Sequence, residues 1–117
     1  MSGLVSYEAG LAAEAAVARH YVRSGRQITA RRWRGTAGEI DLIARDGAEV
    51  IFIEVKQSAT HAQAAQHLTP RQMGRIYASA SEFLAGEPAG QGTECRFDVA
   101  LVDGVGRIEI LENAFAA

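Results

Sequence analysis

Two apolar segments, residues 39–45 and 49–57, lie on either side of an Asp46-Gly47 dipeptide, and this pattern limits the fold more than any other in the chain. Isoleucine and valine, which favour strands, supply much of their apolar content. An Asp-Gly pair between two such segments is typical of a tight hairpin turn. We therefore expect an antiparallel hairpin whose faces and edges must be covered by the rest of the chain.

The part of the chain before the hairpin predicts a helix and a short strand. Residues 7–24 follow the helical period of about 3.6 residues, with Ser6 placed to cap the helix and Gly25 to end it. A strand is expected over residues 27–33, followed by a turn over residues 35–38. The expected apolar face of the helix consists of Leu11, Ala15, Ala18, Tyr21 and Val22.

The part after the hairpin predicts one further helix and two strands. Thr69-Pro70 is a typical cap and first turn, so we expect a helix that continues to about residue 85. The expected apolar face of this helix consists of Met73, Ile76, Tyr77, Ala80, Phe83 and Leu84. Strands are expected over residues 95–102 and 107–111, and loops over residues 58–68 and 86–92.

The predicted order of elements is αβββαββ. Hairpins combined with a helical crossover are typical of the α/β class with a mixed β-sheet flanked by helices. We expect one domain over residues 1–117. No apolar stretch approaches the roughly 20 residues that a membrane span needs, and no signal-peptide pattern is present. Cys95 is the only cysteine, which excludes an internal disulfide. From these observations together we expect a cytoplasmic protein with no membrane contact.

Charge is distributed unevenly along the chain. The formal net charge is −2, which by itself argues against a nucleic-acid partner. However, residues 9–35 contain six arginines against the single acid Glu14, whereas acids outnumber bases over residues 76–117. The basic segment favours a phosphate-binding face, and it is equally typical of a solvated helix surface.

Three charged side chains interrupt the apolar strands of the hairpin. Asp41 stands between Ile40 and Leu42, where a carboxylate is unusual unless it is paired or binds a metal. Glu54 and Lys56 are two residues apart on the other strand and so share one face. Lys56 is also the only lysine in the chain. Lysine offers a compact charge whose pKa is readily shifted, which arginine does not.

The hairpin brings these three residues together. If Arg45 and Ala48 flank the turn, Asp41 lies near Phe52 and diagonally from Glu54. The two carboxylates are then about 4–6 Å apart on one face, close enough to share a cation. Oxygen ligands of this kind suit Mg²⁺ or Mn²⁺. The same residues also fit a buried Asp–Lys–Glu ion network with a purely structural role.

Several segments together carry a resemblance to a known family. They are Gly38-Glu39-Ile40-Asp41-Leu42-Ile43, Phe52-Ile53-Glu54-Val55-Lys56, Gly10 with Glu14, Arg34, Thr69-Pro70-Arg71 and Arg96-Phe97-Asp98-Val99. Over nearly its whole length the chain resembles the YraN family of small bacterial proteins. That resemblance implies the restriction-endonuclease-like fold of the PD-(D/E)xK superfamily, a relation to Holliday-junction resolvases, and a role on nucleic acid.

The expected function is a Mg²⁺- or Mn²⁺-dependent endonuclease that hydrolyses phosphodiester bonds, with DNA as the expected partner and branched DNA as one substrate. The expected catalytic residues are Asp41, Glu54, Lys56 and, by resemblance, Glu14. The expected metal ligands are Asp41, Glu54, the Val55 carbonyl and, by resemblance, Glu14, reached directly or through water. The expected nucleic-acid-binding residues are Arg19, Arg23, Arg31, Arg32, Arg34, Arg71 and Arg75. Resolvase relatives act as dimers, so a homodimer is one option.

Two departures from the family keep other functions open. Ser58 and Gln72 occupy positions where family members usually carry a basic residue, so positive charge near the expected substrate path is reduced. A nucleic-acid-binding module with a vestigial metal site is therefore an alternative to a nuclease. A structural or partner-binding domain with a buried ion network is a third. Trp33, between two arginines, fits either base stacking or a core position, with the core favoured.

Overall fold

The computed structural model describes residues 3–115, and the side chains from residue 7 onward. Its elements are α1 (Gly3–Arg23), β1 (Gln27–Arg34), β2 (Glu39–Asp46), β3 (Glu49–Gln57), α2 (His61–Gln66), α3 (Pro70–Leu84), the 3₁₀ turn η1 (Gly90–Gly92), β4 (Cys95–Val102) and β5 (Ile108–Leu111). The predicted mixed α/β class is confirmed, and the five expected strands are all present.

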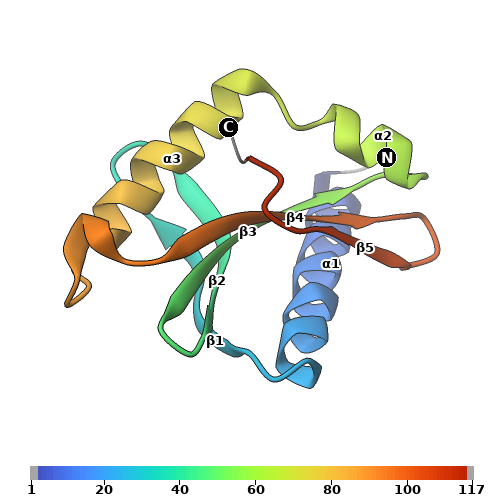
Figure 1. Ribbon diagram of the computed structural model, residues 1–117. Coiled ribbons are helices and arrows are strands. Elements are labelled where there is room, and N and C mark those ends of the chain that lie inside the picture. Colours follow the sequence, from blue (N-terminus) through green and yellow to red (C-terminus); the bar gives the residue numbers. More distant parts are fainter. Residues whose placement is uncertain (1–2, 116–117) are drawn as a thin grey trace.

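The strands form one five-stranded sheet in the order β1-β2-β3-β4-β5. β3 and β4 are parallel, whereas every other neighbouring pair is antiparallel. The connection from β3 to β4 carries α2 and α3, as a parallel crossover requires. α1 covers one face of the sheet and α3 lies over the other, which is compatible with the expected restriction-endonuclease-like fold (Figure 1).

Two predictions about the helices were wrong. The expected loop over residues 58–68 contains α2, which Thr60 caps by accepting a hydrogen bond from the Gln63 backbone at 3.1 Å. A six-residue helix shows too little periodicity to be recognised, and burial of Ala64 against the sheet stabilises it instead. α1 begins at Gly3, so Ser6 lies inside the helix and not before it.

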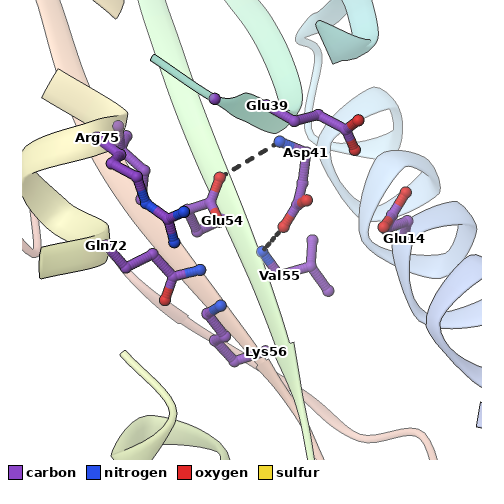
Figure 2. Close-up of a pocket in the computed structure, with 10 residues that line it drawn as sticks. Glu14, Glu39, Asp41, Glu54, Val55, Lys56, Gln72 and Arg75 are labelled. Atoms are coloured by element: carbon purple, nitrogen blue, oxygen red, sulfur yellow. Dashed lines mark hydrogen bonds between the residues drawn. The ribbon is translucent and has the colours of Figure 1, made fainter. Parts of the chain in front are cut away.

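The hairpin forms at the expected dipeptide but with a different register. Asp46 pairs with Glu49 and Leu42 with Ile53, so the turn consists of Gly47 and Ala48, with Gly47 at φ 60°. The prediction that Arg45 and Ala48 flank the turn was therefore wrong. Continued by one residue, the observed register sets Asp41 beside Glu54 and not diagonally from it, as Figure 2 shows.

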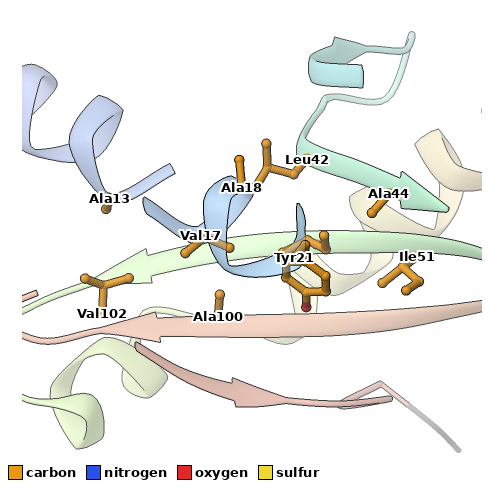
Figure 3. Close-up of a cluster of buried hydrophobic side chains, with 10 residues drawn as sticks. Ala13, Val17, Ala18, Tyr21, Leu42, Ala44, Ile51, Ala100 and Val102 are labelled. Carbon is orange, nitrogen blue, oxygen red and sulfur yellow. The ribbon is translucent and has the colours of Figure 1, made fainter. Parts of the chain in front are cut away.

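The core between α1 and the sheet differs from the predicted apolar face of the helix. Ala13, Val17, Ala18 and Tyr21 are buried there against strand residues such as Leu42 and Ile51 (Figure 3). Of the predicted face, Leu11 and Val22 are instead exposed, by 36% and 55%. Alanines surround most of this helix, so the apolar period marks its buried side poorly. Each large side chain buried here stabilises the fold by about 1.5–3 kcal/mol.

The predicted face of α3 is largely confirmed. Ile76, Ala80 and Leu84 are buried, Met73 and Phe83 are partly buried, and Tyr77 is 43% exposed. Thr69 caps the helix by accepting from the Gln72 backbone at 3.2 Å, and Pro70 opens it. Trp33 packs edge-on against Phe83 with ring centroids 5.4 Å apart, which places it in the core as expected.

Candidate functional site

A cavity of about 340 Å³ lies between α1 and α3, over the ends of β2 and β3. It is lined by Glu14, Gly38, Glu39, Asp41, Glu54, Val55, Lys56, Gln72, Arg75 and Ile76. All four expected catalytic residues are in this set. In Figure 2, Glu54 lies toward α3, Glu14 approaches from α1, and Asp41 lies between them.

β2 is irregular at Asp41. Residues two apart in a strand normally share a face, yet Ile40 packs on the α3 side and Leu42 on the α1 side. The pairing of β2 with β1 also omits Asp41, and its pairing with β3 begins only at Leu42. The Asp41 side chain therefore lies where the pairing of β2 with β3 ends, and its carboxylate accepts a hydrogen bond from the Val55 backbone N–H of β3.

Two reciprocal hydrogen bonds join Asp41 to β3. The Val55 backbone N–H donates to Asp41 Oδ2 at 2.8 Å, and the Asp41 backbone N–H donates to Glu54 Oε1 at 3.3 Å (Figure 2). The Asp41 carboxylate thus accepts from the main chain of β3, and the Glu54 carboxylate accepts from the main chain of β2. These bonds fix the direction of both acids while leaving one oxygen of each outside these two contacts.

Burial raises the pKa of both acids. Glu54 is only 4% exposed, and burial followed by the negative charge of Asp41 raises its pKa to about 8. Burial also raises the pKa of Asp41, although the hydrogen bond from Val55 opposes the change. Two neighbouring acids with raised pKa values form a site that is unfavourable when fully ionised and that a cation would stabilise.

Lys56 lies in the same cavity without a direct bond to either acid. Among the residues that the structure describes, Asp41, Glu54 and Lys56 form no ion pair within 4.0 Å. The positive charge of Lys56 acts through space to lower the pKa of both acids, but the effect of burial is larger and the pKa values remain raised. The structural alternative requires an Asp–Lys–Glu network with close ion pairs. This geometry does not match such a network.

Glu14 enters the cavity from α1 but its carboxylate is already engaged. Arg32 Nε donates to Glu14 Oε1 at 3.0 Å. In residues 3–115, no three His, Cys, Asp or Glu residues are grouped so that they could hold one metal ion. The donors that fit a metal are thus Asp41 and Glu54, and Mg²⁺ commonly binds through one or two carboxylates while keeping several waters.

The expected nucleic-acid-binding arginines are spread over three elements. Arg19, Arg23, Arg31, Arg34, Arg71 and Arg75 are exposed, whereas Arg32 is half-buried. Arg75 is the member of this set that lines the cavity. Arg34 lies 3.3 Å from Glu39, so part of its charge is offset at the cavity rim.

Sequence reasoning missed the contacts that hold the loop before Asp41. Ser79 Oγ donates to the Gly38 carbonyl at 2.9 Å, and the backbone and hydroxyl of Thr36 both donate to Glu82 at 2.9 Å. A side chain at Gly35 would approach Glu82 and Trp33 to 2.9 Å, so the loop packs closely on α3. The available signal was Ser79, a polar residue within an apolar helix face.

A second charged cluster lies away from the cavity and is fully satisfied. Asp98 is 1% exposed and accepts from Tyr21 at 2.7 Å, from Arg96 at 3.0 and 3.2 Å, and from the Asn113 backbone at 3.0 Å. Burial and Asp98 raise the pKa of Tyr21, so its hydroxyl stays protonated as the donor. This cluster joins α1, β4 and the C-terminal segment.

Comparisons with known proteins give a consistent result. The family model described as uncharacterised protein family UPF0102 matches residues 13–102. A UPF0102 protein from Cereibacter sphaeroides is 74% identical over 117 residues, which is the whole of both chains. A UPF0102 protein from Ruegeria pomeroyi is 61% identical over 113 residues, covering 97% of this chain and 92% of that protein. In residues 3–115, no helix has the length and apolar character needed to cross a membrane.

Proposed function

The chain belongs to the UPF0102 family, the YraN family that its sequence resembles, and we propose that it binds nucleic acid and hydrolyses phosphodiester bonds with Mg²⁺ or Mn²⁺. One observation carries the proposal. Two carboxylates, Asp41 and Glu54, are held by each other's strands at a cavity, and burial raises the pKa of both. Such a pair is costly without a cation and suits one with oxygen ligands.

The acids and the lysine would have different roles. Asp41 and Glu54 would hold the cation, with the Val55 carbonyl as a further oxygen donor. When bound there, Mg²⁺ would polarise a phosphate and lower the pKa of a coordinated water. Lys56 is positioned in the same cavity without pairing to either acid, so its ammonium is available to orient the attacking water or offset charge in the transition state.

The opposite wall would contact the substrate. Arg75 and Gln72 line the cavity from α3, facing the hairpin that carries the acids (Figure 2). A guanidinium at this position suits a phosphate oxygen, and the Gln72 amide suits a sugar or phosphate oxygen. The exposed arginines of α1 and β1 would extend the contact to neighbouring phosphates, which fixes the position of the strand but reads no sequence.

The test is cleavage of a panel of linear, single-stranded, nicked and four-way-junction DNA, with matched RNA, in the presence of Mg²⁺ or Mn²⁺. We expect cleavage of at least one substrate by the unmodified protein and none by Asp41→Asn, which removes a ligand charge but keeps the side-chain shape. Cleavage that survives in Asp41→Asn, or that persists in a chelator, would contradict the proposal.

A second function is a nucleic-acid-binding module that no longer cleaves. It is favoured by Gln72, which lines the cavity at a position where the resemblance leads one to expect a lysine. This alternative predicts salt-sensitive binding of the same substrates with no turnover under either metal.

A further inference from the structure

We propose that Arg32 restricts the site to a single divalent cation by holding the Glu14 carboxylate out of ligand range of Asp41 and Glu54. This inference rests on the proposed metal-dependent function and goes beyond it, because it assigns a stoichiometry and names the residue that sets it. Glu14 would then be a withheld ligand, and Arg32 a positioning residue.

The contact between the two residues is specific. Arg32 Nε donates to Glu14 Oε1 at 3.0 Å, and Arg32 Nη1 donates to the Tyr7 hydroxyl at 3.4 Å. The guanidinium carbon also lies 5.6 Å from the centroid of the Tyr7 ring. Side-chain exposure is 33% for Arg32 and 20% for Glu14, so the pair is partly shielded from solvent. The hydrogen bonds to Tyr7 and Glu14 raise the pKa of Arg32, which therefore stays charged.

The backbone of Arg32 is shaped around this contact. Its φ is 49°, in the left-handed region that a long side chain rarely adopts. The neighbouring pairs Arg31↔Leu42 and Trp33↔Ile40 belong to the β1–β2 ladder, while Arg32 and Asp41 between them do not. The same irregularity therefore accompanies the unusual side-chain direction of Asp41 on β2 and the left-handed backbone of Arg32 on β1. An unusual conformation of this kind persists where surrounding contacts maintain it.

The chemistry of the pair explains the stoichiometry. Sites with two divalent cations about 3.5–4 Å apart need carboxylates that bridge or complete both ions. Asp41 and Glu54 suffice for one hydrated ion. Two further acids line the cavity: Glu14 from α1, and Glu39, which is paired with Arg34 at 3.3 Å. While Arg32 is bonded to Glu14 Oε1, its guanidinium offsets part of the charge of that carboxylate and repels a second cation near it. Glu14 is bonded to Arg32 and Glu39 to Arg34, so charge repulsion and the engagement of both further acids oppose binding of that ion.

The test is the number of Mn²⁺ ions bound per chain, measured by titration calorimetry and by the EPR signal of free Mn²⁺, without substrate. We expect one ion for the unmodified protein, two for Arg32→Gln, and one again for Arg32→Gln combined with Glu14→Gln. Arg26→Gln is the matched control, since it breaks an arginine–carboxylate pair of the same 3.0 Å length, with Asp46, away from the cavity. We expect it to bind one ion.

The outcomes separate the inference from the function on which it rests. No Mn²⁺ on the unmodified protein would contradict the proposed metal site. One ion on both the unmodified protein and folded Arg32→Gln, or two on the unmodified protein, would overturn the role of Arg32 alone.

If Arg32→Gln does not fold, Glu14→Gln by itself decides. A withheld ligand predicts Mn²⁺ affinity within about threefold of the unmodified protein, whereas a loss of about tenfold or more would make Glu14 a ligand and refute the inference.

Discussion

Replacing Glu54 by glutamine should stabilise the metal-free protein at high pH and leave it unchanged at low pH. Glutamine keeps the shape of the side chain, and its amide oxygen can still accept the hydrogen bond from the Asp41 backbone. What it removes is a carboxylate that is 4% exposed, with a pKa that burial and Asp41 raise to about 8 from 4.5. The substitution therefore isolates the free-energy cost of ionising this buried group.

The sign follows from linkage between protonation and folding. A carboxyl group with a raised folded-state pKa favours the protonated form, so its contribution to stability is complete below the unfolded-state pKa. That contribution is lost as pH rises through the folded-state pKa of about 8. One pKa unit is worth about 1.4 kcal/mol, which sets an upper limit of about 5 kcal/mol for this shift. Because water reaches the cavity and Lys56 is nearby, we expect about 2 kcal/mol at pH 9.

Thermal melts in chelator from pH 5 to pH 9 provide the assay. For a domain of this size the expected gain at pH 9 is a Tm increase of about 8 °C, falling towards zero near pH 5. Mg²⁺ should raise the Tm of the unmodified protein at pH 8 more than at pH 6, and should have little effect on Glu54→Gln. Glu94→Gln, at an exposed position, is the control and should show no pH-dependent difference. A Glu54→Gln protein that is less stable than the unmodified one at pH 9 would refute the reasoning.

Three further predictions follow from other contacts. Lys56→Ala should abolish cleavage but change the free energy of unfolding by less than about 1 kcal/mol, because Lys56 pairs with neither acid within 4.0 Å among the described residues. A melt showing a loss of about 3–5 kcal/mol would instead indicate a structural ion network. Replacing Arg19 and Arg23 together with alanine should weaken DNA binding for all sequences and flatten its salt dependence in a fluorescence titration, and an unchanged slope would exclude this face. Asp98→Asn should lower the free energy of unfolding in urea by about 3 kcal/mol, because it leaves the half-buried Arg96 without its main partner; a loss below about 1 kcal/mol would mean that Glu49 and Glu112 compensate.

The strands and the three hairpin residues of the site were predictable because their signals are local. Alternation along β3 places Glu54 and Lys56 together, and an acid within an apolar strand marks Asp41. The register was not predictable, because Asp46-Gly47 fits more than one two-residue turn, and the choice between them moved Asp41 from a diagonal position to one beside Glu54. A pattern of residue types alone carries no such distinction.

The walls of the site depend on tertiary structure. The bond from Arg32 to Glu14 joins β1 to α1, and Arg32 has a left-handed backbone conformation. No spacing in the sequence indicates either feature. Gln72 reaches the cavity only because the crossover from β3 lays α3 over the hairpin. α1 resisted prediction for a different reason, since alanines on several sides left Val17 and Leu11 equally plausible as core residues.

The parallel pairing of β3 with β4 has a consequence for synthesis of the chain on the ribosome. α1 and the β2–β3 hairpin leave the ribosome first, so the strands that carry the acids of the site are synthesised before α3 and β4. Until β4 arrives, β3 presents an unpaired edge along a strand in which residues 50–54 are buried in the finished protein. Exposed apolar edges recruit other chains, so nascent or truncated forms that end before Cys95 should aggregate or depend on chaperones during this interval.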